Sequence, residues 1–197
     1  MIGLFDRDVF YKLIVCDLWE PALEVLGVTE PYRLSATSNE RSNRRALSVR
    51  LDGEDLEVAT ARLENALPLV PTLSDGLTTG IAQTVEYQSL SETDGIDDGE
   101  LMLASVLLRS PDSRVLVTGD KRFVNAFKDH HPEYWAAVGE SLITFEQCVL
   151  KILAVHGFEY VRSRAFNSRK CDHSLRLSFG DGRSADDFLA GLLSFAR

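Results

Sequence analysis

Three carboxylates lie at the ends of predicted buried segments, at positions where they could support metal-dependent chemistry. Asp6 directly follows the apolar run at residues 2–5, and Asp120 follows the apolar run at residues 115–118. Glu100 lies in the first turn of a third apolar segment. In an open parallel sheet, ligands bind beyond the carboxyl ends of the strands. We therefore expect these three side chains to meet at one edge of a sheet.

Three carboxylates at one edge repel one another near neutral pH unless a cation neutralises them. Hard oxygen ligands that leave coordination positions open suit Mg²⁺ or Mn²⁺, which keep several waters and bind substrate phosphates. The sequence therefore predicts a Mg²⁺ or Mn²⁺ site whose ligands include Asp6, Glu100 and Asp120.

Each of these acids also has a purely structural interpretation, which the sequence leaves open. Asp6 could cap a helix that begins near Asp8. Asp97 and Glu100 have the spacing of a capping box, which can coexist with a metal site. Asp120 follows a glycine, and Gly-Asp commonly forms a turn after a strand.

Hydrophobic periodicity, prolines and glycines predict the elements that position these acids. Non-alternating apolar runs predict strands over residues 2–5, 114–118 and 141–145. Helical spacing predicts helices over residues 8–27, 54–67, 101–109, 121–128, 146–155 and 184–195. Within the first of these, Pro21 is expected to start a second helical turn that Gly27 closes. We also predict a loop over 72–80, a strand around 85–87, and a strand or turn over 174–179, and leave 31–38 unassigned. Strands that alternate with helices indicate an α/β fold with a central, mainly parallel sheet.

Composition supports one globular domain, or one domain with a short appendage: 197 residues, 45% hydrophobic and 26% charged. No apolar run approaches the roughly 20 residues that span a bilayer. Charged residues also interrupt the region where a secretory signal needs an apolar core, so we expect a cytoplasmic protein without a membrane partner. An odd number of cysteines without a C-x-x-C pair predicts that all three are buried small hydrophobes: Cys16, Cys148 and Cys171.

Charge is distributed unevenly around a formal net charge of -9. Residues 1–155 hold 14 basic and 25 acidic residues, whereas residues 156–197 hold 7 basic and 5 acidic ones. Two basic clusters are candidates for contacts with phosphate: Arg41, Arg44 and Arg45, and Arg162, Arg164, Arg169 and Lys170. The second is interleaved with aromatic residues that could stack on bases: Phe158, Tyr160 and Phe166. The alternatives are a solvated charged face, or a strap whose aromatics pack on the domain.

Four segments together resemble the PIN-domain family in their order and spacing, over residues 1 to about 155. They are Ile2-Gly-Leu-Phe-Asp6, Asp98-Gly-Glu100-Leu-Met-Leu-Ala104, Val115-Leu-Val-Thr118-Gly-Asp120-Lys-Arg-Phe123 and the closing Leu142-Ile-Thr-Phe145. The resemblance implies a three-layer α/β sandwich over 1–155, with 156–197 as a basic C-terminal extension that could pack on it. This extension departs from small PIN toxins, which are single compact domains, and puts a simple toxin role in doubt.

The resemblance also implies a function, a Mg²⁺- or Mn²⁺-dependent endoribonuclease that cleaves single-stranded RNA. Carried onto this sequence, the implied catalytic residues and metal ligands are Asp6, Glu100 and Asp120. Many members have a fourth acidic ligand, for which Glu40 is the best candidate. RNA is the implied partner, and an inhibitor or antitoxin-like protein and a second copy of the chain are further candidate partners.

Two other functions stay open. Phe5-Asp6-Arg7-Asp8 also resembles the Asp-x-Asp of haloacid-dehalogenase-like phosphatases, in which Asp6 would be the nucleophile and Asp8 the acid/base. Those families usually continue with Gly-Thr, whereas Val9-Phe10 follows here. The third function is a catalytically weak PIN scaffold that binds a protein partner through its basic C-terminal segment.

Histidine and tryptophan residues are assigned structural roles. His130 and His131 are neighbours in a turn, and neighbouring loop residues rarely both bind one metal, so we predict surface histidines. Trp19 and Trp135 are predicted to be packing residues.

Overall fold

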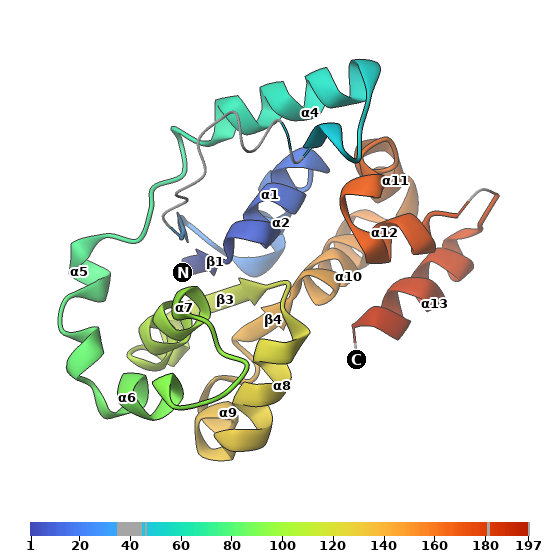
Figure 1. The fold of residues 1–197 in the computed structure, drawn as a ribbon. Helices are drawn as coiled ribbons and strands as arrows, with labels where there is room; N and C mark the ends of the chain where they lie inside the picture. Colours follow the sequence, from blue (N-terminus) through green and yellow to red (C-terminus); the bar gives the residue numbers. More distant parts are fainter. Residues whose placement is uncertain (35–44, 46, 181, 197) are drawn as a thin grey trace. The chain divides into compact units, whose positions relative to one another are not determined.

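A computed structural model describes residues 1–34, 45, 47–180 and 182–196. Its centre is a four-stranded, all-parallel sheet in the order β2-β1-β3-β4, flanked by helices (Figure 1). The strands are β1 (Ile2–Phe5), β2 (Glu30–Arg33), β3 (Arg114–Thr118) and β4 (Leu142–Thr144). The predicted α/β class and parallel sheet are confirmed, and β2 accounts for part of the unassigned segment.

Two compact units make up the chain. The first unit consists of residues 1–9, 28–35 and 71–145, and the second unit of residues 10–27, 36–70 and 146–197. Residues after 155 therefore belong to a unit that also contains two earlier segments of the chain. The predicted division after residue 155 stays a prediction.

The first unit holds the whole sheet together with short helices. Its helices are α5 (Asp75–Thr78), η1 (Ile81–Gln83), α6 (Val85–Ser91), α7 (Asp98–Leu108), η2 (Pro111–Ser113), α8 (Lys121–His130) and α9 (Pro132–Val138). Helix α1 (Arg7–Val15) begins in the first unit and continues into the second. Helix α10 (Phe145–His156) begins at Phe145, the last residue of the first unit, and its other residues belong to the second.

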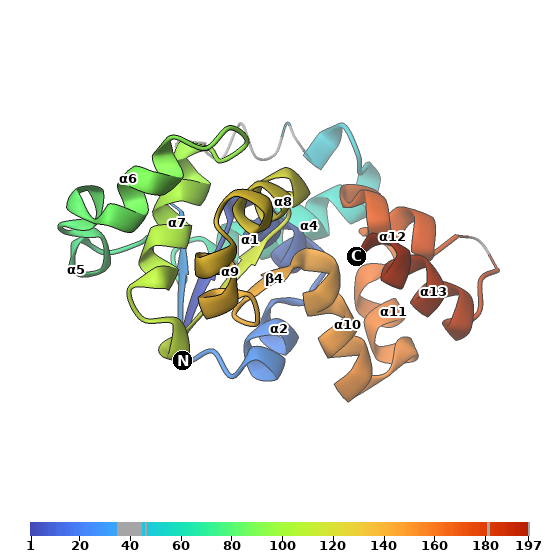
Figure 2. The ribbon, with the colours of Figure 1, turned by 90° about the horizontal axis from the view of Figure 1, so that it is seen from below.

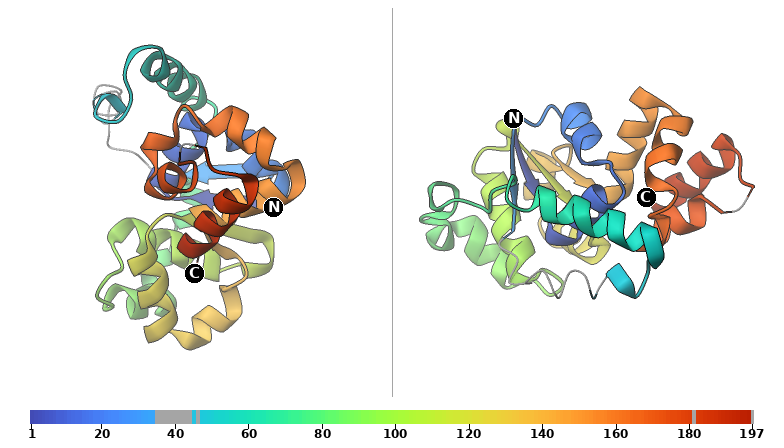
Figure 3. Two further views of the ribbon diagram at one scale, coloured as in Figure 1. Left: turned by 90° about the vertical axis from the view of Figure 1, so that its right-hand side faces the viewer. Right: turned by 90° about the horizontal axis from the view of Figure 1, so that it is seen from above.

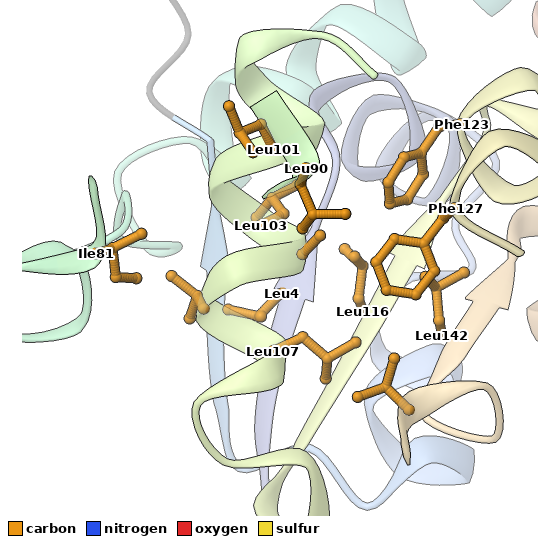
Figure 4. Packing of buried hydrophobic residues seen from close by; sticks show 13 residues of the cluster. Leu4, Ile81, Leu90, Leu101, Leu103, Leu107, Leu116, Phe123, Phe127 and Leu142 are labelled. Carbon is orange, nitrogen blue, oxygen red and sulfur yellow. The ribbon is translucent and has the colours of Figure 1, made fainter. Parts of the chain in front are cut away.

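A hydrophobic core joins one face of the sheet to α7 and α8 (Figure 4). Leu4, Leu116 and Leu142 are partners in the register of β1, β3 and β4, and all three belong to this core. Residues on the opposite face of these strands, such as Val117 and Ile143, are buried as well. Burial on both faces explains why the strand sequences are continuously apolar rather than alternating.

The second unit is helical in its described part. Its helices are α2 (Trp19–Leu26), α4 (Gly53–Ala66), α11 (Phe158–Ala165), η3 (Arg169–Cys171), α12 (His173–Ser178) and α13 (Ala185–Phe195). Helices α11 to α13 form one group, with α12 against α13 (Figure 2). The same group is drawn in orange and red in Figure 3, where the right-hand view also shows α4 along its length.

Local capping signals explain several helix ends as predicted. Gly27 ends α2 in the left-handed conformation with φ 64°, which costs a glycine little. Ser184 caps α13 in a capping box with Asp187. Pro21 is the third residue of α2, so that helix begins two residues earlier than its proline suggested.

Three local predictions are wrong. Residues 85–87 form the first turn of helix α6 rather than a strand, because the Thr84 side chain caps it and Leu90 is fully buried in the core. Residues 173–178 form helix α12, which the Asp172 side chain caps. The predicted loop over 72–80 contains α5. In α6 and α12 a side-chain cap and tertiary burial outweigh the intrinsic preference of the residues.

The cysteines are buried and unpaired, as predicted. Burial raises the pKa of the thiols of Cys148 and Cys171, to about 12 and about 11, so both stay protonated at neutral pH. Trp19 is buried, and Trp135 packs against the core of the first unit, which confirms their packing roles. None of the helices in the described residues is long and apolar enough to cross a membrane.

Candidate active site

Asp6 and Asp120 follow neighbouring strands of the sheet. The backbone N–H of Asp6 donates to the carbonyl of Val117 at 3.0 Å, so the β1–β3 ladder continues into this residue. The backbone N–H of Asp120 donates to the hydroxyl of Thr118, the last residue of β3, at 3.1 Å. Backbone and side-chain hydrogen bonds thus hold both acids just beyond the carboxyl ends of β1 and β3.

Glu100 is placed at the N-terminus of α7 by a capping box. The Asp97 carboxylate accepts from the Glu100 N–H at 2.8 Å, and the Glu100 carboxylate accepts from the Asp97 N–H at 3.0 Å. The structural role predicted for Glu100 is therefore confirmed. We call Asp6, Asp97, Glu100 and Asp120 the acidic edge.

The acidic edge shifts the protonation of Glu100. Glu100 is only 6% exposed. This burial is the largest of the effects that raise the pKa of Glu100 to about 7. The negative charges of Asp97, Asp120 and Asp6 raise the pKa further, in that order. Electrostatic interaction with both Asp6 and Asp120 shows that the three predicted acids share one region of the first unit.

Burial also raises the pKa of Asp6, and the charges of Asp8 and Asp97 add to the effect. A hydrogen bond from the backbone N–H of Arg7 works in the opposite direction, but the net shift is upward. The raised pKa values of Asp6 and Glu100 indicate that nearby cations and hydrogen-bond donors only partly compensate the negative charge of the acidic edge. Such perturbed acids are typical of functional sites.

Asp120 differs because it has a cation beside it. Burial alone would raise its pKa, but hydrogen bonds from Arg122 and from the backbone of Phe123 lower it below the ordinary value. The Arg122 guanidinium Nη2 lies 2.9 Å from the Asp120 carboxylate, and the Arg122 side chain is 86% exposed. Asp120 also caps α8, a structural role other than the Gly-Asp turn that the sequence left open.

The donor set has the chemistry that Mg²⁺ and Mn²⁺ prefer, because all its oxygens come from carboxylates. Within the described residues, however, no three His, Cys, Asp or Glu side chains are grouped closely enough to hold one metal ion. Two of the carboxylates have other partners, since Glu100 binds the Asp97 N–H and Asp120 binds Arg122. Binding a cation at the acidic edge would require these side chains to exchange partners.

Replacing Glu100 with glutamine is expected to stabilise the chain in alkaline but not in acidic buffer. Its pKa is about 7 in the folded chain against 4.5 as the ordinary value, so the folded state binds the proton more tightly. The free energy of unfolding therefore falls as pH rises from about 4.5 to about 7, by on the order of 3 kcal/mol. Glutamine preserves the capping box but carries no charge.

Urea denaturation at pH 5 and pH 8, without divalent cations, measures this effect. We expect Glu100→Gln to gain stability chiefly at pH 8, and the control Glu92→Gln, at an exposed acid of the same unit, to change little at either pH. An equal gain at both pH values would contradict the raised pKa.

The remaining predicted ligand and phosphate contacts lie either outside the described residues or in the second unit. Glu40, Arg41 and Arg44 lie outside the described residues. Arg45 is exposed in the second unit. The other two, Arg162 and Arg164, belong to α11 of the second unit, and their roles in RNA binding stay predictions.

His131 is not the surface residue that its sequence context predicted. It is 7% exposed, its Nε2 lies 2.7 Å from the hydroxyl of Thr93, and its ring stacks on Tyr134. The error arises because Thr93 is 38 residues away in sequence. His130 is exposed, as predicted.

Two residues of this site were not among the predicted site residues. The negative charge of Asp97 raises the pKa of both Asp6 and Glu100, whereas its backbone N–H lowers that of Glu100. Arg122 is the cation that binds Asp120. The capping-box spacing pointed to Asp97 only as a structural residue. No local pattern distinguishes Arg122 from an ordinary exposed arginine.

Comparisons of the chain with known protein families, with curated proteins and with solved structures found no significant match.

Proposed function

We propose that this protein is a Mg²⁺- or Mn²⁺-dependent endoribonuclease with a PIN-like, three-layer α/β architecture, acting on single-stranded RNA. The observation that carries the proposal is the electrostatic interaction of Glu100 with Asp6 and Asp120, beyond the carboxyl ends of β1 and β3. Ligands of open parallel sheets bind at this position. The four sequence segments that resemble PIN domains contribute these same acids.

Asp6, Glu100 and Asp120 would hold the cation, with Glu40 as the proposed fourth ligand. A bound cation supplies a water of lowered pKa and stabilises the charge that develops on the phosphate oxygens. Arg122 would separate from Asp120 once that carboxylate binds the cation. Its guanidinium would then be able to pair with a substrate phosphate through two hydrogen bonds.

Incubation of the full chain with an end-labelled single-stranded RNA tests the proposal. We expect cleavage with Mn²⁺ or Mg²⁺, and intact RNA when EDTA removes the cation, because carboxylates alone cannot stabilise the anionic transition state. Gel analysis of the labelled products gives the rate and the cleavage positions.

Two outcomes would replace the proposal. Intact RNA with both cations, together with hydrolysis of p-nitrophenyl phosphate that Asp8→Asn abolishes, would indicate a phosphatase with Asp6 as nucleophile. Intact RNA and no ester hydrolysis would indicate a catalytically weak scaffold that acts through a partner.

A further inference from the structure

A basic pocket lies in the second unit, and its lining includes Arg169 and Lys170 of the second basic cluster. Its volume is about 420 Å³, and it is lined by Val49, Arg50, Arg169, Lys170, Arg176 and Gly180. Small-molecule sites typically measure roughly 300 to 1,000 Å³, so this pocket is large enough for a ligand of several heavy atoms. We refer to it as the basic pocket.

Hydrogen bonds to the backbone hold two of its arginines in place. The Arg50 guanidinium donates to the carbonyl of Cys171, which joins two segments 121 residues apart. Arg169 donates to the carbonyl of Phe166 at 2.7 Å, and its guanidinium lies 3.7 Å from the centroid of the Phe166 ring. The contact of Arg50 uses only part of its guanidinium, which carries five N–H donors.

Three of the four cations that line the basic pocket are not neutralised by a carboxylate in the described part of the chain. Arg50, Lys170 and Arg176 form no ion pair with a described residue, and Arg176 contacts the ring nitrogen of His173 at 3.2 Å. Asp172 is the only acid between residues 168 and 180. Its carboxylate binds Lys12 at 3.0 Å and does not line the pocket.

Arg50, Lys170 and Arg176 carry like charges around one cavity, and these charges repel one another unless an anion lies between them. Arginine forks match phosphate oxygens in geometry, and lysine adds a mobile positive charge. We propose that the basic pocket binds a ligand that carries two or more phosphate groups. The phosphates could come from a small oligophosphate or from consecutive positions of an RNA backbone, and this proposal does not depend on the nuclease activity.

Two arginines of the C-terminal segment that the sequence offered for phosphate contact, Arg162 and Arg164, have carboxylate partners in the structure. Arg164 binds the Asp17 carboxylate at 2.7 Å, and Arg162 lies 3.7 Å from the Glu159 carboxylate. The aromatic rings of this segment contact other side chains of the second unit, for example Phe158 on Phe188 and Tyr160 on His156. Phosphate binding is therefore expected at the basic pocket rather than along the face of α11 that carries Arg164.

Calorimetric titration of the full chain tests the proposal with two probes, pyrophosphate and a short oligouridylate. EDTA is present throughout, so that metal-dependent cleavage of the RNA cannot occur and failure of the nuclease proposal does not affect the result. The test variant is Lys170→Gln/Arg176→Gln. These two side chains are chosen because, unlike Arg50 and Arg169, they form no hydrogen bond to the backbone of the described residues, so that their replacement should leave the fold intact. The control is Lys151→Gln, which removes one exposed charge on α10 outside the pocket.

Binding of pyrophosphate that weakens at least about tenfold in the double variant, and little in the control, would support a small oligophosphate as ligand. Binding of the oligouridylate alone, with the same loss and a log–log salt slope reduced by roughly 0.7 per phosphate contact, would support an RNA backbone. If neither probe binds, or if both retain their affinity in the double variant, the proposal is wrong. Circular dichroism of each variant confirms that the chain remains folded.

Discussion

Asp6→Asn is expected to abolish metal-dependent RNA cleavage while leaving the chain at least as stable as the wild type. Asparagine has nearly the same shape but lacks the negative charge that binds a cation. Loss of a charged ligand removes several kcal/mol of transition-state stabilisation, which corresponds to a rate lower by roughly a thousandfold or more. Gel assays of cleavage at saturating Mn²⁺ measure the rate.

Thermal unfolding of the same variant separates a catalytic effect from misfolding. Because burial and the charges of Asp8 and Asp97 raise the pKa of Asp6, its ionised form destabilises the folded chain above the ordinary pKa range of an aspartate. The neutral asparagine removes this repulsion, so we expect an equal or higher melting temperature at pH 8.

Asp120→Asn is expected to be equally inactive but slightly less stable. Its pKa is lowered by Arg122 and the helix N–H groups, so ionised Asp120 stabilises the folded chain. Asparagine still caps α8, which limits the loss. The control Asp129→Asn, at an exposed acid of the same helix, should retain full activity. Full activity of either Asp6→Asn or Asp120→Asn would rule out the proposed metal site.

Asp172→Asn is expected to cause a large loss of stability, roughly 3 kcal/mol at pH 7. The ion pair with Lys12 is well shielded from solvent, with side-chain exposures of 17% and 6%, and removal of one partner leaves a poorly solvated charge. Asparagine retains the cap of α12, so the loss reports mainly on the ion pair. Denaturation by urea at 25 °C measures it.

The pH dependence identifies the cause. Burial would raise the pKa of Asp172, but Lys12, Ser174 and the Leu175 N–H lower it below the ordinary value. The stabilisation is therefore fully present above the unfolded pKa and is lost as pH falls through the lower, folded value. The difference between wild type and variant should persist from pH 8 to pH 5 and shrink below about pH 4.

The result also decides how residues after 155 contribute to the protein. A large loss would show that this segment is integral to the second unit, since Lys12 lies in α1 and Asp172 precedes α12. The exposed pair of Glu159 and Arg162 provides the comparison, because Glu159→Gln should change stability little. A small loss for both variants would favour a segment that is only loosely attached.

The sequence by itself determined those features that depend on a few neighbouring residues. The strand at 114–118 was predictable because a strand buried on both faces must be continuously apolar. The capping box of Asp97 and Glu100 was predictable because its two partners are three residues apart. The positions of Asp6 and Asp120 at one edge followed from the rule that parallel strands end on the same side.

Only the tertiary structure decided the features that depend on partners distant in sequence. Arg164 was a candidate for phosphate contact, and only the structure shows that Asp17, 147 residues away, binds it. The 85–91 segment is a helix whose Leu90 is buried in the core beside α7. Arg50 belongs to the basic pocket, where it donates to the carbonyl of Cys171, 121 residues away. Long-range ion pairs and burial depend on which distant segments the loops bring into contact. Local sequence patterns do not encode that information, because they depend only on residues close together in the chain.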